Sequence, residues 1–301
     1  MAADRALEVL KAGPLTLIQD LGRLGFGSIG VGSSGAADRG AFRLGARLLA
    51  QPYSAAALEV TFGGLSVRAR GDLQLALTGA QAPATLDGRA VGYFGPFTVA
   101  DGQVLTLASP SVGLRSYLSV RGGIAVAPVL GSRSTDTLSG LGPPPLRARD
   151  VLPVGPAPAD FPNLDVAPAP LLAAAETLVL HALRGPRDDW LADLDALAAT
   201  SWTISTDSDR VGIRLSGVPL QRQASRLERE LPSEGVVSGS IQVPPSGQPV
   251  VFLADHPVTG GYPVVAVLLD ADIDRAAQVV PGQRVRIVLG QIAPERRLKS
   301  R

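Results

Sequence analysis

The sequence predicts a mainly β protein with a few helices, divided into two modules. Short apolar runs bounded by Gly, Pro, Asp or Asn recur along its 301 residues, which is typical of many strands joined by turns. Only three segments space their apolar residues as a helix does. Between Val151 and Glu176 the composition turns to proline and alanine, which is typical of a linker. A chain of this length can bury a core in each of two modules.

The predicted strands fall into two groups, one on each side of the linker. The first module covers residues 1–150, the second covers residues 177–290, and residues 291–301 form a basic tail. Two of the runs alternate apolar and polar side chains, as strands with one solvated face do. The predicted strands are 58–62, 65–70, 73–78, 104–108 and 114–120 in the first module, and 178–183, 202–206, 211–215, 250–254, 264–269 and 284–289 in the second.

Three helices are predicted from capping residues and apolar spacing. Asp38 can cap a helix that ends near residue 51. A second helix is expected to begin at residue 185 and to carry Trp190 and Leu197 on one face. A third, short helix is expected from Asp272 to Gln278, before a Pro-Gly turn.

The composition excludes several classes of catalytic site. Cysteine is absent, so disulfides, thiolate metal sites and cysteine nucleophiles are excluded together. Lys11 and Lys299 are the only lysines, so the body of the chain has no phosphate-loop, Schiff-base or biotinylated lysine. His181 and His256 are distant in the sequence, and neither has a second ligand at helix or hairpin spacing, so no metal site is predicted.

Charge and hydropathy bear on location and partners. The net charge is +1 and the pI is about 8.1, so the chain lacks the concentrated positive charge of a nucleic-acid-binding protein. The segment Met1–Gly13 has no apolar core of signal-peptide length, and the run Val264–Leu269 is too short to span a bilayer. We therefore expect a cytoplasmic protein with no nucleic-acid or membrane partner.

Four loop regions are dense in Gly, Ser, Thr, Asp and Arg. Glycines let backbone amides approach a ligand closely, and Ser, Thr and Arg donate hydrogen bonds to carboxylate, carbonyl or phosphate oxygens. Any one region could be an ordinary set of turns. Together they favour an enzyme site for a small amide-type substrate. The regions are residues 19–39, residues 121–123 with 131–135, residues 208–214, and residues 238–262.

Asp255-His256 is the strongest single candidate for catalysis. The pair follows a predicted strand and precedes a Gly-Gly turn, so both side chains should emerge at a strand end. A carboxylate and an imidazole there could perform general acid–base work on an amide or a carboxylated intermediate. The alternative is that Asp255 caps the turn and His256 bonds the backbone. His181, in the middle of a predicted strand, is interpreted as structural.

Three further charged residues could be structural or functional. Glu59 lies inside an apolar strand, so its carboxylate is either on the solvated face or buried and functional. Asp209 and Arg210 are interpreted as pairing with neighbouring groups rather than acting as catalysts.

In their order along the chain, these segments resemble the family called allophanate hydrolase subunit 2, or KipA, which includes the C subunit of bacterial 5-oxoprolinase. Each motif is short, but the ordered set is specific, and the resemblance extends from about Leu7 to about Val288. The motifs are Gln19-Asp-Leu-Gly-Arg23, Ser34-Gly-Ala-Ala-Asp-Arg39, Leu58-Glu59, Leu77-Thr-Gly-Ala80, Arg121-Gly-Gly123, Gly131-Ser-Arg-Ser-Thr135, Ser208-Asp-Arg210, Gly239-Ser-Ile-Gln-Val-Pro244, Ala254-Asp-His256 and Thr259-Gly-Gly-Tyr-Pro263.

The resemblance implies two cyclophilin-like β-barrel modules and three alternative functions. In 5-oxoprolinase, the protein joins two others, one KipI-like and one LamB-like, to convert 5-oxo-L-proline into L-glutamate with ATP. In urea carboxylase, a similar region is the carboxyltransferase, for which biotin would have to arrive on another chain. In the KipA branch, the protein binds and counteracts a kinase inhibitor without turnover.

We predict the first function, with ATP used by the complex at a site that the sequence does not specify and with no metal in this chain. Asp255 and His256 would be acid–base or substrate-orienting groups. One departure from the family pattern is Pro257-Val258, where the family usually has Gln-Thr, and it bears on substrate identity and activity. The arginines expected to hold the substrate carboxylate or a phosphorylated intermediate are Arg23, Arg121, Arg133 and Arg210. The other residues expected to bind substrate are Gln19, Asp20, Ser34, Asp38, Glu59, Thr78, Ser132, Ser134, Ser208, Asp209, Gln242, Thr259, Gly260 and Tyr262.

Overall fold

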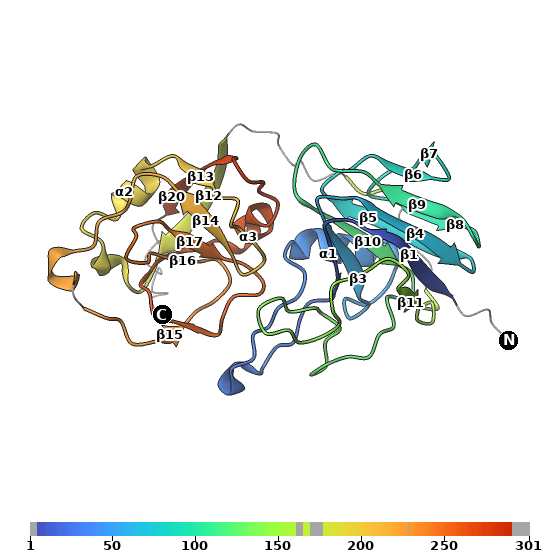
Figure 1. The fold of residues 1–301 in the computed structure, drawn as a ribbon, viewed down its shortest axis with the longest axis horizontal. Coiled ribbons are helices and arrows are strands. Elements are labelled where there is room, and N and C mark those ends of the chain that lie inside the picture. The colour runs from blue at the N-terminus through green and yellow to red at the C-terminus, as the bar shows by residue number, and fades with distance from the viewer. Residues whose placement is uncertain (1–4, 161–164, 169–176, 228, 291–301) are drawn as a thin grey trace, which may run out of the picture.

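In the computed structural model, two strand-rich modules lie side by side along the long axis of the molecule (Figure 1). The structure describes residues 5–160, 165–168, 177–227 and 229–290. Within these residues there are three α-helices, and most of the remaining regular structure is strand. This confirms the predicted fold class, mainly β with a few helices. The predicted basic tail lies outside the described residues.

The first module consists of two antiparallel sheets that pack against each other. One has the strand order β11-β1-β4-β9-β6-β7 and the other the order β2-β3-β10-β5-β8. The strands of the first sheet are β11 (Val151–Pro153), β1 (Ala6–Ala12), β4 (Leu65–Arg70), β9 (Val104–Leu107), β6 (Ala84–Leu86) and β7 (Arg89–Ala90); those of the second are β2 (Leu15–Gln19), β3 (Ala57–Thr61), β10 (Arg115–Val120), β5 (Leu73–Gly79) and β8 (Pro96–Val99).

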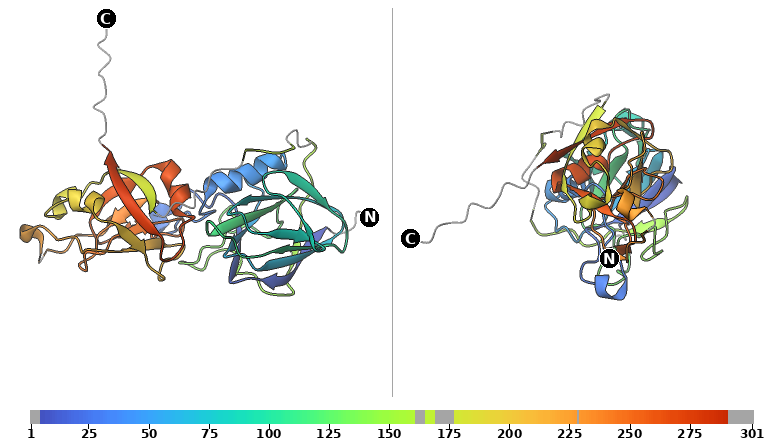
Figure 2. Two further views of the ribbon diagram at one scale, coloured as in Figure 1. Left: turned by 90° about the horizontal axis from the view of Figure 1, so that it is seen from above. Right: turned by 90° about the vertical axis from the view of Figure 1, so that its left-hand side faces the viewer.

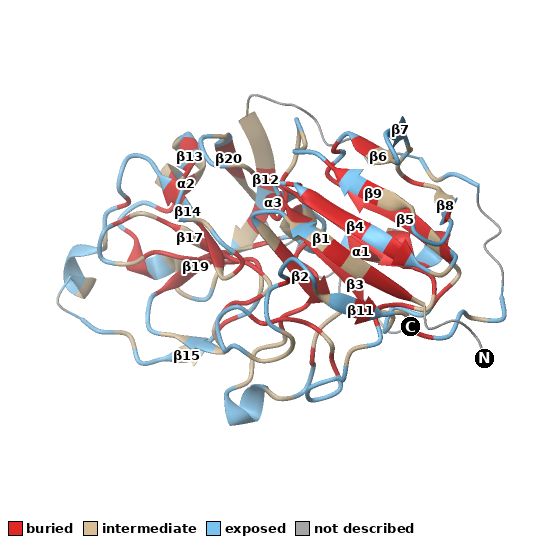
Figure 3. Ribbon diagram, turned by 45° about the vertical axis from the view of Figure 1, so that its right-hand side comes forward, coloured by how far each residue is buried: buried red, intermediate tan, exposed pale blue. Residues whose placement is uncertain are grey.

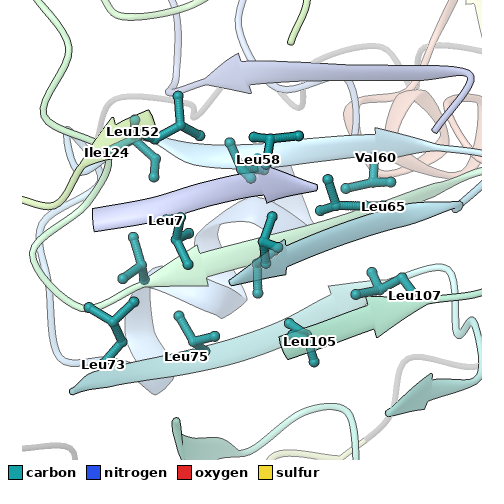
Figure 4. Packing of buried hydrophobic residues seen from close by; sticks show 14 of the residues in the cluster. Leu7, Leu58, Val60, Leu65, Leu73, Leu75, Leu105, Leu107, Ile124 and Leu152 are labelled. Carbon is teal, nitrogen blue, oxygen red and sulfur yellow. The ribbon is translucent and has the colours of Figure 1, made fainter. Parts of the chain in front are cut away.

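The core of the first module lies between these two sheets (Figure 4). Leu7 and Leu105 come from one sheet, Leu58 and Leu75 from the other, and all four are almost completely buried. Full burial of each such side chain stabilises the fold by about 1.5–3 kcal/mol. On β4, buried and exposed residues alternate toward the strand's end, so the sheet faces the core on one side and solvent on the other.

The second module is a closed barrel with the strand order β12-β19-β16-β17-β14-β13-β20. Strands β12 and β20 pair in parallel, and the other neighbours are antiparallel. Trp202 is fully buried in its core, and the indole Nε1 donates to the Leu197 carbonyl at 2.9 Å. The strands are β12 (Thr177–Arg184), β19 (Val264–Leu268), β16 (Ser240–Gln242), β17 (Val250–Phe252), β14 (Gly212–Ser216), β13 (Trp202–Ile204) and β20 (Arg284–Gly290); β15 (Glu234–Gly235) and β18 (Thr259–Gly260) form a separate ribbon.

The helices agree with the prediction in two of three cases. Helix α1, Arg39–Leu48, is capped as expected, because the Asp38 carboxylate accepts a hydrogen bond from the Ala41 amide at 2.8 Å. Helix α3, Asp270–Ala276, lies two residues earlier than predicted. The second prediction is wrong: a 3₁₀ turn at 188–190 and a five-residue helix, α2 (Asp195–Ala199), stand in place of one helix. Between them Leu191 is extended and bridges to Arg222.

All the predicted strands are present, with ends within two residues of the expected ones. The strands that were not predicted are β1, β2, β6, β7, β8, β11, β15, β16 and β18. Strand β11 lies in the segment expected to be a linker, and it pairs with β1. The first module therefore continues past residue 150 to at least residue 153.

Helices α1 and α3 meet where the two modules face each other (Figure 2). The Asp274 carboxylate on α3 accepts hydrogen bonds from the backbone amides of Arg39 and Gly40, at 2.8 and 3.0 Å. The side-chain oxygen of Gln278 accepts from the amides of Leu114 and Arg115, at 3.0 and 2.9 Å. Amides left unpaired at the edge of the first module thus find acceptors in the second, which fixes how the modules meet.

Candidate active site at the junction of the modules

A buried ion network joins the two modules. Arg210, in the loop before β14, donates from Nε and Nη2 to the two carboxylate oxygens of Asp255, at 2.9 and 3.0 Å. Its Nη1 contacts Glu59 on β3 of the first module, and its Nη2 also donates to the Gly35 carbonyl at 2.6 Å. The side chains of all three charged residues are at most 2% exposed. This position fits the interpretation of Arg210 as a pairing residue.

Asp255 receives further hydrogen bonds from the first module. The Ser34 hydroxyl donates to one oxygen at 2.7 Å, and the amide and hydroxyl of Thr137 donate to the other, at 2.9 and 2.7 Å. Burial by itself would raise the pKa of Asp255, but the attraction of Arg210 and these hydrogen bonds outweigh it and hold the pKa below its ordinary value. Asp255 is thus an ionised group with both oxygens occupied, which suits it to positioning rather than to proton transfer.

Glu59 is fully buried, so its carboxylate does not lie on the solvated face of the strand. One carboxylate oxygen accepts hydrogen bonds from the Tyr117 hydroxyl at 2.8 Å and from the Ala37 amide at 2.9 Å. Burial, followed by the charge of Glu59, raises the pKa of Tyr117 well above its ordinary value, so the phenol stays protonated and donates. Glu59 therefore anchors the loop that leads into α1.

His256 lies beside this network and lines a cleft of about 600 Å³. Its Nδ1 lies 2.7 Å from the Pro257 carbonyl, and a carbonyl can only accept, so Nδ1 carries the proton. In the neutral ring, Nε2 is then a proton acceptor. The ring also lies against Phe252, with centroids 6.0 Å apart. This bond to the backbone is the contact that the structural interpretation of His256 expected. It occupies Nδ1 and leaves Nε2 to act on a substrate.

The cleft brings both signs of charge next to the imidazole. Arg39 and Arg43 come from α1, one helical turn apart, and Asp270 and Asp274 come from α3. The remaining wall includes the hydroxyl residues Ser33 and Ser238 together with apolar residues around β19. Burial raises the pKa of Asp274, against the opposing effect of the two α1 amides that it caps. Such a cleft can hold a small molecule that carries both a carboxylate and hydrogen-bonding groups.

The Asp20 region holds the loop across residues 20–35 in place. One Asp20 oxygen accepts hydrogen bonds from the hydroxyls of Ser132 and Ser134, each at 2.6 Å, and the other accepts from the Arg133 amide at 2.7 Å. Arg23 is buried, and its guanidinium contacts the Ser134 carbonyl. These predicted site residues gather in one cluster, but none of them lines the His256 cleft.

The remaining predicted site residues of the first module bond to its own backbone. The side-chain Nε2 of Gln19 donates to the Thr135 carbonyl at 2.9 Å, and the Thr78 hydroxyl donates to the Ala41 carbonyl at 2.8 Å. Arg121 donates to the Pro158 carbonyl at 2.8 Å, and Arg133 donates from Nε to the Val126 carbonyl at 2.8 Å. These contacts hold loops and the start of the linker segment against the module.

In the second module too, the predicted site residues bond to nearby backbone groups. The Ser208 hydroxyl accepts from the Arg214 amide at 3.0 Å, and Asp209 accepts from two amides of its own turn. Gln242 is buried and donates to the Tyr262 carbonyl at 2.9 Å, while the Tyr262 side chain is partly exposed. Thr259 and Gly260 form β18. None of these lines the His256 cleft.

Sequence reasoning missed several residues that line the cleft: Arg43, Ser33, Ser238, Asp270 and Asp274. Arg39 belongs to one of the motifs but was not predicted to bind substrate. The spacing of two arginines four residues apart on a capped helix was a usable signal, because such residues share one helix face. The two aspartates could not have been found in this way, because only the packing of α3 against α1 brings them there.

Metal-binding groups and membrane-spanning helices are both absent from the described part of the chain. Among residues 5–160, 165–168, 177–227 and 229–290, no group of three or more His, Cys, Asp or Glu side chains is placed to hold a metal ion. No helix within these same ranges is long and apolar enough to cross a membrane.

Comparison with known proteins shows where the chain belongs. Residues 29–289 match the family model described as carboxyltransferase domain, subdomain A and B. The chain is 39% identical over 300 residues to the C subunit of 5-oxoprolinase from Escherichia coli (strain K12), and the match covers 98% of this chain and 94% of that protein. It is 31% identical over 321 residues to urea amidolyase of Saccharomyces cerevisiae, and that match covers 98% of this chain and 17% of that protein.

Solved structures extend the likeness to three dimensions. The K. lactis urea amidolyase superposes with a TM-score of 0.90 at 28% identity, over 96% of this chain and 19% of that one. TTHA0988 superposes with a TM-score of 0.84 at 32% identity, over 96% of this chain and 56% of that one. Both matches span the two modules, in agreement with the expected barrel architecture. The chain therefore belongs to the carboxyltransferase-domain family, subdomains A and B, together with the C subunit of 5-oxoprolinase and the urea amidolyases.

Proposed function

We propose that this chain is the C subunit of an ATP-dependent 5-oxoprolinase complex, which hydrolyses 5-oxo-L-proline to L-glutamate in the cytoplasm. The observation that carries the proposal is the 39% identity to the corresponding E. coli protein over 94% of that protein's length. A match over nearly the full length of both chains favours the same role in the complex over a shared fold alone. Its partners would be a KipI-like protein and a LamB-like protein, the other two components of such a complex.

The His256 cleft supports this proposal through its chemistry. The substrate 5-oxoproline is a small lactam with one carboxylate, and the guanidinium groups of Arg39 and Arg43 would bind that carboxylate. Nε2 of His256 would accept a proton from the water that attacks the lactam carbonyl, and would return it to the ring nitrogen as the C–N bond breaks. Asp255 would not transfer protons. Its bonds to Arg210, Ser34 and Thr137 would hold in place the loop that carries His256.

This assignment changes the role proposed for four arginines. Arg23, Arg121 and Arg133 donate to backbone carbonyls, and Arg210 is paired with two carboxylates. We propose Arg39 and Arg43 in their place, because these two line the His256 cleft and the other four do not. Arg39 also donates from Nη2 to the Leu21 carbonyl at 3.3 Å, which leaves its other nitrogens to bind the carboxylate. ATP would be used by the complex, and we assign it no site in this chain. We also propose no metal for the site.

A second candidate function is the carboxyltransferase step of a biotin-dependent enzyme. The family description and the superposition on K. lactis urea amidolyase favour it. The body of the chain has no lysine between Lys11 and Lys299, so biotin would have to be carried by another chain. The arginines of the cleft would then face the carboxylated biotin ring. A third candidate role is that of a KipA-type protein, which binds a kinase inhibitor. Under this role, the chain would turn over no substrate.

The deciding experiment measures glutamate release from 5-oxoproline and ATP. This chain is co-expressed with the proteins encoded beside it, and the preparation is compared with one that lacks it. Activity that appears only in its presence would support an obligatory component of a 5-oxoprolinase. Soluble, assembled protein without such activity would overturn the proposal. Carboxyl transfer to urea from a biotinylated carrier protein, measured in parallel, tests the second candidate.

A further inference from the structure

Two carboxylates from different modules share the backbone amides at the start of α1. Asp38, in the first module, accepts from the Ala41 amide at 2.8 Å. Asp274, on α3 of the second module, accepts from the amides of Arg39 and Gly40, at 2.8 and 3.0 Å. The first amides of a helix have no partner within the helix, so these acceptors determine how its first turn is held.

Asp274 lines the His256 cleft, but its carboxylate is directed at α1. Oδ1 accepts from Arg39 and Oδ2 accepts from Gly40, so each oxygen already has a donor. Burial raises the pKa of Asp274, while the two amides and the charges of Arg43 and Arg39 oppose that rise. Both guanidinium groups therefore lie near enough to interact with this carboxylate.

The first module holds the body of α1 without help from Asp274. Phe42 is buried, and its ring lies edge-on to Tyr117 with centroids 6.5 Å apart. The Ala41 carbonyl accepts from the Thr78 hydroxyl at 2.8 Å. Loss of the Asp274 contacts should therefore leave the helix folded and change the part that lies before these anchors, which is its first turn.

We propose that Asp274 is a positioning residue for substrate binding, which holds the first turn of α1 so that the Arg39 guanidinium is presented to the cleft. This role rests on the proposed function, in which Arg39 and Arg43 bind the carboxylate of 5-oxoproline. A residue of the second module would thus set the geometry of a binding group in the first. Docking of α3 against α1 is then a condition for tight substrate binding.

The charge of Asp274 and its contacts would affect substrate binding in opposite directions. A carboxylate beside two arginines weakens their attraction for the carboxylate of the substrate. The hydrogen bonds to α1 instead hold the first turn in a geometry that binds. Removal of the charge alone should strengthen binding, whereas removal of the contacts should weaken it. A rise in KM after the charge is lost would therefore identify positioning as the dominant effect.

Gly40 leaves space for this contact. It lies exposed in the first turn of α1, and a methyl group added there would lie 2.8 Å from Oδ2 of Asp274. That distance is too short for carbon and oxygen, so the carboxylate, at the end of a flexible side chain, would have to move. Alanine also favours a helix more than glycine does. Gly40→Ala should therefore displace Asp274 from α1 while it keeps every charge and the helix.

The test measures KM and kcat for 5-oxoproline in the reconstituted complex. Asp274→Asn should raise KM about fivefold and change kcat less, because the NH₂ group of asparagine cannot accept a hydrogen bond from a backbone amide. Gly40→Ala should raise KM in the same direction with all charges kept.

Asp270→Asn is the charge-matched control. Asp270 lines the same cleft one turn earlier on α3, and its side chain forms no hydrogen bond or ion pair with the part of the chain that the structure describes. Loss of its charge should therefore lower KM slightly. An unchanged or lower KM for Asp274→Asn, or an equal rise for Asp270→Asn, would overturn the positioning role. If Asp274→Asn lowers the melting temperature of the chain, Gly40→Ala decides, and an unchanged KM in that variant overturns the role.

Failure of the proposed function would give a different result. The wild-type complex would then release no glutamate, and the same variants would be compared by the Kd of 5-oxoproline for the purified full-length chain, measured by calorimetry. Weaker binding by Asp274→Asn and Gly40→Ala, with no weakening by Asp270→Asn, would support the positioning role without the enzymatic one. A wild-type chain that neither turns over nor binds 5-oxoproline would overturn both.

Discussion

Arg210 binds both oxygens of Asp255, at 2.9 and 3.0 Å, while its third nitrogen contacts Glu59 in the other module. The positive charge is thus shared between a carboxylate of each module, and all three side chains are at most 2% exposed. Figure 3 shows that buried residues, in red, lie along strands of both modules. A buried ion pair of this kind adds little net stability compared with apolar packing, but breaking it leaves a charge without compensation. Because Asp255 immediately precedes His256 in the chain, the ion pair also fixes the position of the His256 backbone.

Arg210→Met should strongly destabilise the protein. The substitution removes the guanidinium and leaves Glu59 and Asp255 buried with fewer partners, which costs about 3–5 kcal/mol. The measurement is the free energy of unfolding in urea. Arg214→Met, on the exposed face of β14, is the matched control and should change that free energy by less than about 0.5 kcal/mol. Equal effects of the two variants would mean that the network does not hold the modules together.

His256→Gln should lower turnover of the reconstituted complex without unfolding this chain. Loss of a general acid–base group reduces kcat by about 10²–10⁴-fold. The variant keeps a polar side chain in the cleft, so the melting temperature should remain near that of the wild type. His181→Gln, which alters the other histidine and its contact with Asp272, is the control and should retain activity. Full activity of the His256 variant would remove this residue from the mechanism.

Arg43→Gln should raise the KM for 5-oxoproline by about tenfold or more while changing kcat less, because the residue would bind the substrate carboxylate before and during the reaction. Arg47→Gln lies one turn further along α1, outside the cleft, and serves as the control. The measurement is the substrate dependence of glutamate release. A KM unchanged in both variants would remove Arg43 from substrate binding.

The sequence predicted much of the fold because many of its strands are apolar or alternating runs bounded by turn residues. Leu73–Gly79 and Arg284–Gly290 alternate in this way, and both were expected within one residue of their ends. Several very short strands were missed, since residues such as Arg89–Ala90 carry no periodicity and form a strand through pairing with a neighbour. The seven-residue strand β1 was also missed, although its residues alternate in part. The second helix was predicted wrongly because Leu191 pairs with a distant residue, a tertiary contact that local spacing does not reveal.

The site was predicted in part. The Asp255-His256 segment lies at the module junction, and the position of His256 beside a cleft agrees with the expectation of a strand-end site. The motif residues Asp20, Ser132 and Ser134 instead bond one another. A loop rich in hydroxyl and carboxylate side chains has the same composition whether it binds a ligand or holds another loop in place. Only three-dimensional packing distinguishes the two, and the same is true of the α1 arginines.

We propose that the modules are joined through the segment between Val151 and Glu176, as its composition predicts. Limited proteolysis should then cut first within this segment. The start of it is held, because Val151–Pro153 pairs with β1 and Arg121 binds the carbonyl of Pro158. We therefore expect the first cleavage after residue 160, with two fragments identified by mass spectrometry. A first cut inside either module, with this segment intact, would contradict the proposed boundary.

Asp38 should make the stability of the protein depend on pH. Burial raises its pKa from 3.8 to about 6, against the hydrogen bonds from Gln278 and Ala41, while the charges of Asp274 and Glu59 add to the increase. Because the folded pKa lies above the unfolded one, the folded state binds the proton more tightly. The stability that Asp38 contributes is therefore fully present below pH 3.8 and is lost as the pH rises through about 6.

Comparison with Asp38→Asn isolates this effect, since an amide cannot ionise. The wild type should lose about 3 kcal/mol relative to the variant between about pH 4 and 7, which is the shift of roughly two pKa units expressed as free energy. Urea unfolding at several pH values gives the difference directly. Asp207→Asn, at an exposed position, should show no such trend. A difference between wild type and Asp38→Asn that stays constant across this range would mean that Asp38 is already ionised in the folded protein at pH 4.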